Sequence, residues 1–108
     1  MIVAVIPCYR ELDHILNVIS TIGPEIDVIL VIDDGCPEKT GDFVKKHCVD
    51  PRVQVLQHKH NCGVGAATLT GYEKALSIGA EVIVKIDGDG QMDPKLVPDL
   101  IKPILEGK

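Results

Sequence analysis

Two aspartates near the end of the sequence carry its strongest chemical signal. Asp87 and Asp89 stand one residue apart, directly after the apolar run 81–86. Two carboxylates this close repel each other unless a cation neutralises them, which favours a divalent metal over a role in core packing. Mg²⁺ or Mn²⁺ bound by one or two carboxylates takes its other ligands from water and phosphate oxygens. We therefore predict that Asp87 and Asp89 hold Mg²⁺ or Mn²⁺ on a phosphorylated ligand; the alternative is a solvated Asp-Gly turn.

An EF-hand calcium loop is another interpretation of this segment, because Asp87, Asp89 and Gln91 alternate as its ligands would. Such a loop requires glycine at its sixth position and a bidentate glutamate at its twelfth. Those positions hold Met92 and Pro98 here, so the calcium-loop interpretation fails.

Further polar side chains follow two earlier apolar runs. Asp33 and Asp34 come after the second run, where one carboxylate is expected to accept a hydrogen bond from a nucleotide base and the other to support the turn. An ordinary turn is the alternative. After the first run, Tyr9 offers a flat face for stacking a base, and Glu11 stands near a helix start, where a carboxylate is also simply stabilising.

The segment 61–67, Asn-Cys-Gly-Val-Gly-Ala-Ala, is similar to a phosphate cradle at a helix start. The dinucleotide fingerprint would follow the first strand, however, and a Walker loop would need Gly-Lys-Ser or Gly-Lys-Thr. We therefore interpret these glycines as a tight turn and close helix packing beside the site. His58 and His60 could ligate a metal, but two histidines in a polar loop are expected to be solvated.

The elements that must position these groups follow from the alternation of apolar runs with amphipathic segments. Strands are expected at 2–6, 28–32, 53–56 and 81–86, with Pro7 ending the first, and helices at 12–19, 41–47, 65–77 and from Pro98. This order predicts an α/β fold: a Rossmann-like parallel sheet with helices on both faces, in the strand order third, second, first, fourth. Ligands of such sheets bind beyond the carboxyl ends of the strands, where three of the four runs carry their polar residues.

Composition narrows the function classes. The 108 residues are 45% hydrophobic and suit one domain with a single core, and the net charge of −5 argues against nucleic acid as a partner. The four cysteines form no C-x-x-C pair, so we expect free thiols and a cytoplasmic location. The sequence contains no apolar run long enough to span a membrane and no pattern typical of a signal peptide.

Four motifs together resemble the family-2 glycosyltransferases, inverting enzymes of the GT-A fold that include polyprenyl-phosphate mannose synthases and polysaccharide-building transferases. They occur in that family's order and spacing, at 6–11, 31–35, 61–71 and 87–91. The resemblance covers essentially the whole chain. It implies that residues 1–108 are the nucleotide-sugar-binding half of a GT-A domain.

Carried over by position, the resemblance implies a nucleotide pocket around base and ribose formed by Pro7, Tyr9, Glu11, Ile32 and Asp34. Asp87 and Asp89 correspond to the family's D-x-D pair, with Asp89 on the metal and Asp87 toward ribose or metal. Gln91 would line the same pocket. The chain departs from the usual family residues at three positions within these motifs and the residue after them, namely Cys8, Arg10 and Cys36. These departures leave the nucleotide preference open.

The resemblance also implies a reaction in which an acceptor hydroxyl or phosphate oxygen attacks the anomeric carbon of a nucleotide-diphosphate sugar. The metal neutralises the charge on the departing diphosphate. The acceptor, a lipid phosphate or a glycan, and the general base would be handled by residues beyond Lys108. Residues 1–108 alone are therefore expected to contain no catalytic residue and to bind donor nucleotide without transferring sugar. The full-length protein is expected at the cytoplasmic face of a membrane.

Two other classes of protein were compared with this pattern. A phosphoacceptor receiver domain places its acidic pair after the first strand and needs a later lysine, for which this chain has no clear place. A non-catalytic nucleotide-binding module remains open. The strand 81–86 is β-branched and nearly uncharged, so we expect it to pair at a sheet edge and to form a homodimer.

Overall fold

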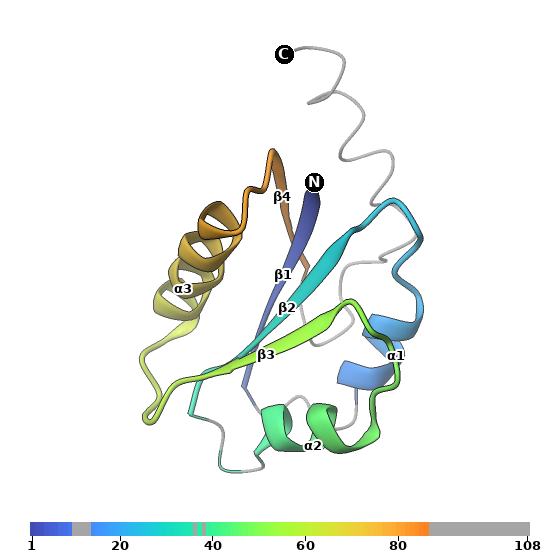
Figure 1. Cartoon of the computed structure of the whole chain (residues 1–108). Helices are drawn as coiled ribbons and strands as arrows, with labels where there is room; N and C mark the ends of the chain where they lie inside the picture. Colours follow the sequence, from blue (N-terminus) through green and yellow to red (C-terminus); the bar gives the residue numbers. More distant parts are fainter. Residues whose placement is uncertain (10–13, 36, 38, 87–108) are drawn as a thin grey trace.

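The chain forms an α/β unit in which strands and helices alternate (Figure 1). The computed structural model describes residues 1–9, 14–35, 37 and 39–86. The helix expected from Pro98 lies outside these residues. The elements, in chain order, are β1 (Ile2–Cys8), α1 (Ile15–Ser20), β2 (Val28–Asp33), α2 (Thr40–His47), β3 (Val53–Gln57), α3 (Val64–Ser77) and β4 (Val82–Lys85).

All strand pairs in the sheet are parallel, and the strand order is β3-β2-β1-β4. The order predicted from the sequence is therefore confirmed. The central strands β1 and β2 run side by side with Ile6 opposite Val31, and β4 pairs with β1 through Val3 and Ile83. In the described residues β3 and β4 form the two edges of the sheet.

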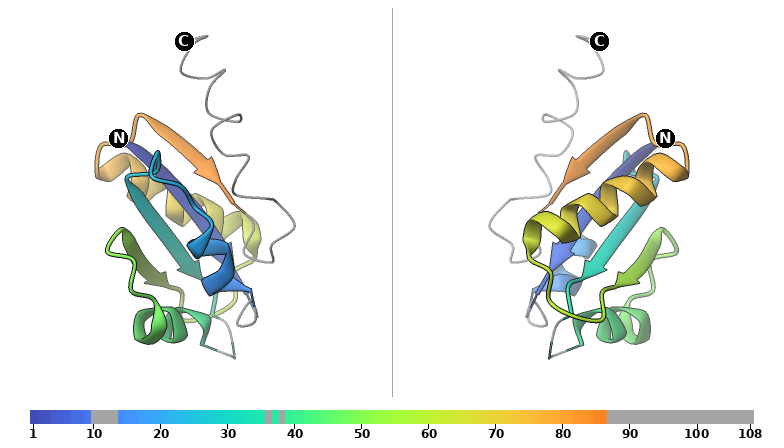
Figure 2. Two further views of the ribbon diagram at one scale, coloured as in Figure 1. Left: turned by 90° about the vertical axis from the view of Figure 1, so that its right-hand side faces the viewer. Right: turned by 90° about the vertical axis from the view of Figure 1, so that its left-hand side faces the viewer.

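Helices cover both faces of the sheet, as Figure 2 shows, with α3 on one side and α1 and α2 on the other. Because both faces of β1 and β2 are covered, these strands are apolar at almost every position instead of alternating. On the α1 and α2 side the core includes Ala4, Ile6, Ile29, Val31, Ile15, Val18, Ile19 and Val44. On the α3 side it includes Val3, Val5, Leu30, Ile32, Ala67 and Ala75.

We predicted from the sequence that Pro7 ends the first strand, and this prediction is wrong. Strand β1 continues to Cys8, and Pro7 pairs with Ile32. Along a strand, residues two apart direct their backbone groups to the same side, and the carbonyl of Val5 accepts a hydrogen bond from Ile86 on the β4 side. The nitrogen of Pro7 therefore faces the β4 side, but β4 pairs no further than Val5 opposite Lys85. Among the residues that the structure describes, the missing N–H of proline therefore costs no ladder bond.

Helix α3 approaches the sheet closely at one glycine. A Cβ on Gly71 would overlap the side chain of Val5, so only glycine allows this spacing. Close helix packing was predicted for the glycines of 61–67 instead. This prediction is wrong for Gly65, where a Cβ would meet nothing within 4 Å. Gly63 does make the expected turn, with φ of 97°.

Arg52 ties the connection between α1 and β2 to the start of β3. Its guanidinium donates to the carbonyls of Gly23 at 2.7 Å, Ile26 at 3.1 Å and Ile22 at 3.1 Å. The same group pairs with Asp50 at 2.8 Å. This arginine therefore satisfies backbone acceptors that the short helix α1 and its following turn leave without helical partners. Within the described part of the chain, no helix is both long and apolar enough to cross a bilayer.

Candidate functional site

The carboxyl ends of the strands are joined by backbone hydrogen bonds into one edge. The N–H of Asp34 donates to the carbonyl of Cys8 at 3.0 Å, and the N–H of His58 donates to the carbonyl of Asp33 at 2.8 Å. The N–H of Ile86 donates to Val5 at 2.9 Å. This edge is where the polar residues were predicted to gather, and the described ones among them do so.

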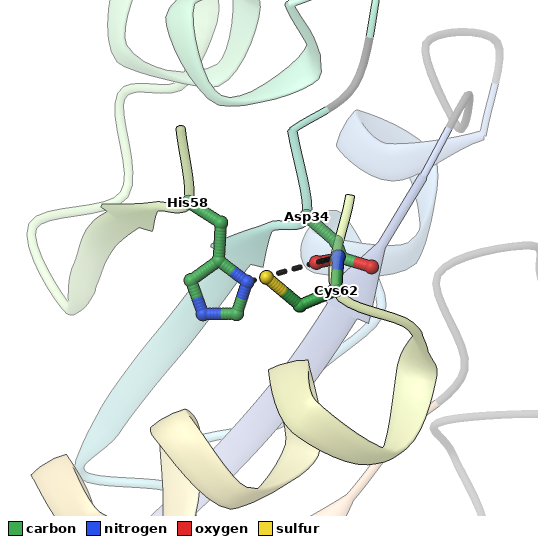
Figure 3. Close-up of side chains that lie close together, drawn as sticks. All are labelled: Asp34, His58 and Cys62. Carbon is green, nitrogen blue, oxygen red and sulfur yellow. Dashed lines mark hydrogen bonds and ion pairs between the residues drawn. The ribbon is translucent and has the colours of Figure 1, made fainter. Parts of the chain in front are cut away.

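Asp34 is the centre of this edge (Figure 3). Its Oδ1 accepts hydrogen bonds from the His58 ring at 2.8 Å and from the Cys62 N–H at 2.9 Å. Its Oδ2 accepts from the Gly63 N–H at 2.9 Å. The side chain lies just after β2 and is almost fully buried, so it holds the loop that precedes α3 against the end of the sheet.

The charge on Asp34 is stabilised by these donors. Burial raises the pKa of the carboxyl, but the Cys62 N–H, the His58 ring and the Gly63 N–H together outweigh burial and leave the pKa below its usual value. Asp34 is therefore a carboxylate at neutral pH. An ionised carboxylate has about four lone-pair positions, and the three donors described here leave one of them, on Oδ2, for a ligand.

The sequence led us to expect a solvated His58, and this prediction is wrong. The His58 side chain instead links Asp34 to α3. Its Nδ1 faces Asp34, its Nε2 lies 2.8 Å from the Thr70 hydroxyl, and its side chain is only 17% exposed. The Thr70 hydroxyl also lies 3.0 Å from the carbonyl of Ala66, one turn earlier in α3. His60 is exposed, in agreement with the expectation for it.

Asp33 has the structural role that the sequence assigned to one member of the acidic pair. Its Oδ2 accepts a hydrogen bond from the N–H of Gly41 at 2.8 Å, in the first turn of α2. A Cβ on Gly41 would lie 2.9 Å from both Cβ and Oδ2 of Asp33. This carboxylate is buried and directed toward α2, away from the Asp34 cluster.

Gly35 brings the two loops into backbone contact. Its φ is +66°, and a Cβ there would lie 2.5 Å from the nitrogen of Asn61 and 2.8 Å from the carbonyl oxygen of His60. Any other residue would be strained in φ and would also push the loop away from Asp34.

The other predicted nucleotide-binding residues divide into described and undescribed ones. Pro7 and Ile32 are buried, and Tyr9 is half-buried just after β1. Glu11, Asp87, Asp89 and Gln91 lie outside the described residues. Their assignment to the pocket stays a prediction.

Sequence reasoning did not identify the partners of Asp34. His58 and Cys62 come from other loops, and together with Asp34 they place a nitrogen, a sulfur and an oxygen atom within 4.8 Å of one another. It is the sole group of three or more His, Cys, Asp or Glu ligand atoms among the described residues. The signal that could have found it is Asn61-Cys62-Gly63, which we interpreted as a tight turn and close helix packing beside the site.

The parallel sheet with helices on both faces, and with polar residues at the carboxyl edge, defines a Rossmann-like α/β fold of the GT-A type. Residues 3–108 match the model of the family described as Glycosyl transferase family 2. The chain belongs to this family, as the four sequence motifs predicted.

Two curated relatives and one solved structure illustrate the similarity. UDP-N-acetylglucosamine–dolichyl-phosphate N-acetylglucosaminyltransferase of Methanococcus voltae is 32% identical over 119 residues, which cover 97% of this chain and 47% of that protein. Undecaprenyl-phosphate mannosyltransferase of Micrococcus luteus is 34% identical over 107 residues, covering 95% and 44%. S. aureus TarS 1–349 in complex with UDP aligns with a TM-score of 0.74 at 21% identity, covering 97% of this chain and 32% of TarS. The chain thus spans just under half the length of the two curated relatives.

Proposed function

We propose that this chain is the donor-binding half of a metal-dependent, inverting glycosyltransferase that uses a nucleotide-diphosphate sugar. The observation that carries the proposal is the ionised, three-fold bonded Asp34 at the carboxyl edge of a family-2 sheet. The two relatives compared above are named for transfer to dolichyl phosphate and undecaprenyl phosphate. A lipid-phosphate acceptor at the cytoplasmic face of a membrane is therefore the acceptor we favour for the whole protein, with a saccharide as the alternative.

In the proposed nucleotide pocket, Asp34 recognises the base. Its Oδ2 retains one position that can accept a hydrogen bond from a base N–H, and charged acceptors make the stronger hydrogen bonds. The half-buried Tyr9 supplies a face for stacking, and the buried Pro7 and Ile32 form the floor beneath. We also assign Glu11 and Gln91 to this pocket, as the resemblance to the family implies.

Asp87 and Asp89 are the residues we propose for the metal. Two carboxylates are a donor set that fits a hard cation such as Mg²⁺ or Mn²⁺. When bound, the cation would neutralise the charge on the leaving diphosphate. The sheet supports this proposal, because the N–H of Ile86 donates to the carbonyl of Val5 in β1 and the D-x-D motif begins at the next residue.

Calorimetry with UDP and GDP tests the proposal. We expect binding in Mg²⁺ or Mn²⁺, none detectable with a chelator, and at least a tenfold loss in Asp89→Asn. Asp42→Asn, an exposed carboxylate on α2, serves as the matched control and should bind like the wild type. Binding that persists unchanged in chelator or in Asp89→Asn contradicts the metal-dependent site.

We further infer that residues 1–108 alone transfer no sugar, because the family's general base and acceptor groove are expected beyond Lys108. Transfer of labelled sugar to a polyprenyl phosphate by this stretch alone would contradict that inference. A longer protein containing this chain should transfer sugar, and its failure to do so while binding nucleotide would favour the non-catalytic module.

A further inference from the structure

The side chains of Asp34, His58 and Cys62 form a mixed group of metal ligands distinct from the D-x-D motif (Figure 3). They come from three places: the end of β2, the end of β3 and the loop before α3. Nitrogen, thiolate sulfur and a single carboxylate oxygen are donors that Zn²⁺ prefers, whereas Mg²⁺ favours oxygen alone. This cluster therefore differs in chemistry from the pair Asp87 and Asp89.

The distances require only small movements to hold such an ion. With bonds of about 2.0–2.3 Å and tetrahedral angles, the ligand atoms of zinc stand about 3.4–3.6 Å apart. His58 Nδ1 and Asp34 Oδ1 are now 2.8 Å apart, and all three ligand atoms lie within 4.8 Å of one another. The first pair must open by about 0.6 Å, and the exposed Cys62 thiol must move in by no more than about 1.2 Å, to reach that spacing. The Cys62 thiol now donates to the carbonyl of His60 at 3.3 Å, and rotation of this exposed side chain about χ1 would exchange that weak contact for the metal.

The groups around these ligands are already arranged to support a metal. If Nδ1 of His58 binds the ion, the ring carries its remaining proton on Nε2, which lies 2.8 Å from the Thr70 hydroxyl. Thr70 can accept this proton's hydrogen bond while its own hydroxyl donates to Ala66 at 3.0 Å. Metal-bound histidines typically donate their second N–H to such a fixed partner. Asp34 is likewise held in place by the Cys62 and Gly63 N–H groups.

We propose that Asp34, His58 and Cys62 bind Zn²⁺, or a divalent metal of similar ligand preference, with water in the fourth position. The ion takes the place of the proton on Nδ1 of His58; a neutral ring takes up a proton at Nε2 in its place, whereas a doubly protonated ring releases the Nδ1 proton to solvent. The Cys62 thiol also releases its proton to solvent. Two anionic ligands then balance the charge of the ion. Because Asp34 also belongs to the proposed base pocket, zinc occupancy opposes nucleotide binding; this consequence rests on the proposed function.

Zinc titration against a chromophoric chelator, with reduced thiols and excess Mg²⁺ to occupy hard-cation sites, tests the site directly. We expect one Zn²⁺ per chain and at least tenfold weaker binding in Cys62→Ser and in His58→Ala. Loss of the hydroxyl that faces His58 Nε2, in Thr70→Val, should weaken binding by about 10- to 100-fold. The matched controls are Cys48→Ser and His60→Ala, which alter a cysteine and a histidine outside the cluster. The zinc affinity of each should stay within about twofold of the wild type, a much smaller change than that expected for Thr70→Val.

Cobalt substitution gives a readout that does not depend on the fold surviving the histidine change. Wild type and Cys48→Ser should show a thiolate-to-cobalt charge-transfer band, and Cys62→Ser, which alters an exposed side chain, should lack it. Equal zinc affinity in Cys62→Ser and wild type, or equal loss in the two controls, overturns the site.

Nucleotide calorimetry tests separately whether bound zinc opposes nucleotide binding. We expect added Zn²⁺ to weaken UDP or GDP binding in the wild type and not in Cys62→Ser. If zinc binds as predicted and nucleotide affinity does not change, the competition is wrong and the metal site stands. If no nucleotide binds under any condition, the proposed function fails, whereas the zinc titration still decides the site.

Discussion

Replacing Asp34 by asparagine tests the claim that one carboxylate holds the loop before α3 against the sheet. An amide keeps one acceptor oxygen but presents NH₂ where the second oxygen stood. The least costly orientation keeps the bonds to His58 and Cys62 and turns the NH₂ toward the Gly63 N–H, so one hydrogen bond to a charged acceptor is lost.

The expected destabilisation follows from that loss. A hydrogen bond to a charged group contributes about 1.5–3 kcal/mol. The Gly63 N–H also lies 3.0 Å from Oδ1 of Asn61, so it keeps a partner and the cost falls toward the lower end. We expect the free energy of unfolding of Asp34→Asn to fall by about 2 kcal/mol, or roughly 10 °C in Tm for a chain of this size.

Denaturant unfolding and amide hydrogen exchange measure this effect globally and locally. The Cys62 and Gly63 amides should exchange about 30-fold faster in Asp34→Asn, the factor that corresponds to about 2 kcal/mol. Asp42→Asn, in which the amide oxygen can still accept the hydrogen bond from Gln57, should change stability by no more than about 0.5 kcal/mol. Equal unfolding midpoints in the two variants, or unchanged exchange at both amides, would refute the role assigned to Asp34.

The stability difference between the wild type and Asp34→Asn should also depend on pH. The pKa of Asp34 is lowered in the folded chain, so its contribution is complete above the unfolded-state pKa and is lost as pH falls through the folded-state pKa. The stability difference between wild type and Asp34→Asn should therefore be constant from about pH 5 to 8 and shrink below about pH 4. A difference that grows on acidification contradicts the direction of the shift.

Three further changes give direct tests of the fold. Gly35→Ala should cost at least about 2 kcal/mol because of its positive φ and the backbone beside it, whereas Gly65→Ala, in open space on α3, should stabilise by up to about 1 kcal/mol in denaturant unfolding. Arg52→Lys should lower stability by about 1–3 kcal/mol in the same assay, since an ammonium cannot pair with Asp50 and reach three carbonyls together. For the homodimer proposed through the edge 81–86, light scattering should show association that increases with concentration; a wild type that stays monomeric at high concentration contradicts that proposal.

The strands, their order and the position of Asp33 and Asp34 at the carboxyl edge could be predicted from the sequence because each depends on a local pattern. Buried parallel strands are continuous apolar runs, and polar residues just after them must lie at the carboxyl edge. The course of β1 through Pro7 could not be predicted, since it depends on where the neighbouring strand β4 stops pairing. The contacts of Asp34 could not be predicted for a similar reason. His58 and Gly63 are 24 and 29 residues away in the sequence, and two of the three donors are backbone N–H groups of a loop, which no sequence pattern marks.

The separate roles of Asp33 and Asp34 follow from the alternation of side chains along β2. Val31 faces the α1 and α2 side of the sheet, and Asp33, two residues later, bonds to Gly41 in α2. Ile32 faces α3, and Asp34 correspondingly bonds to the loop that leads into α3. The pair therefore divides between the two faces, and its carboxylates do not compete for the same donors. Asp34 lies almost fully buried at the carboxyl edge, ionised and fixed by three donors, so a ligand that reaches Oδ2 meets an acceptor that needs no reorganisation.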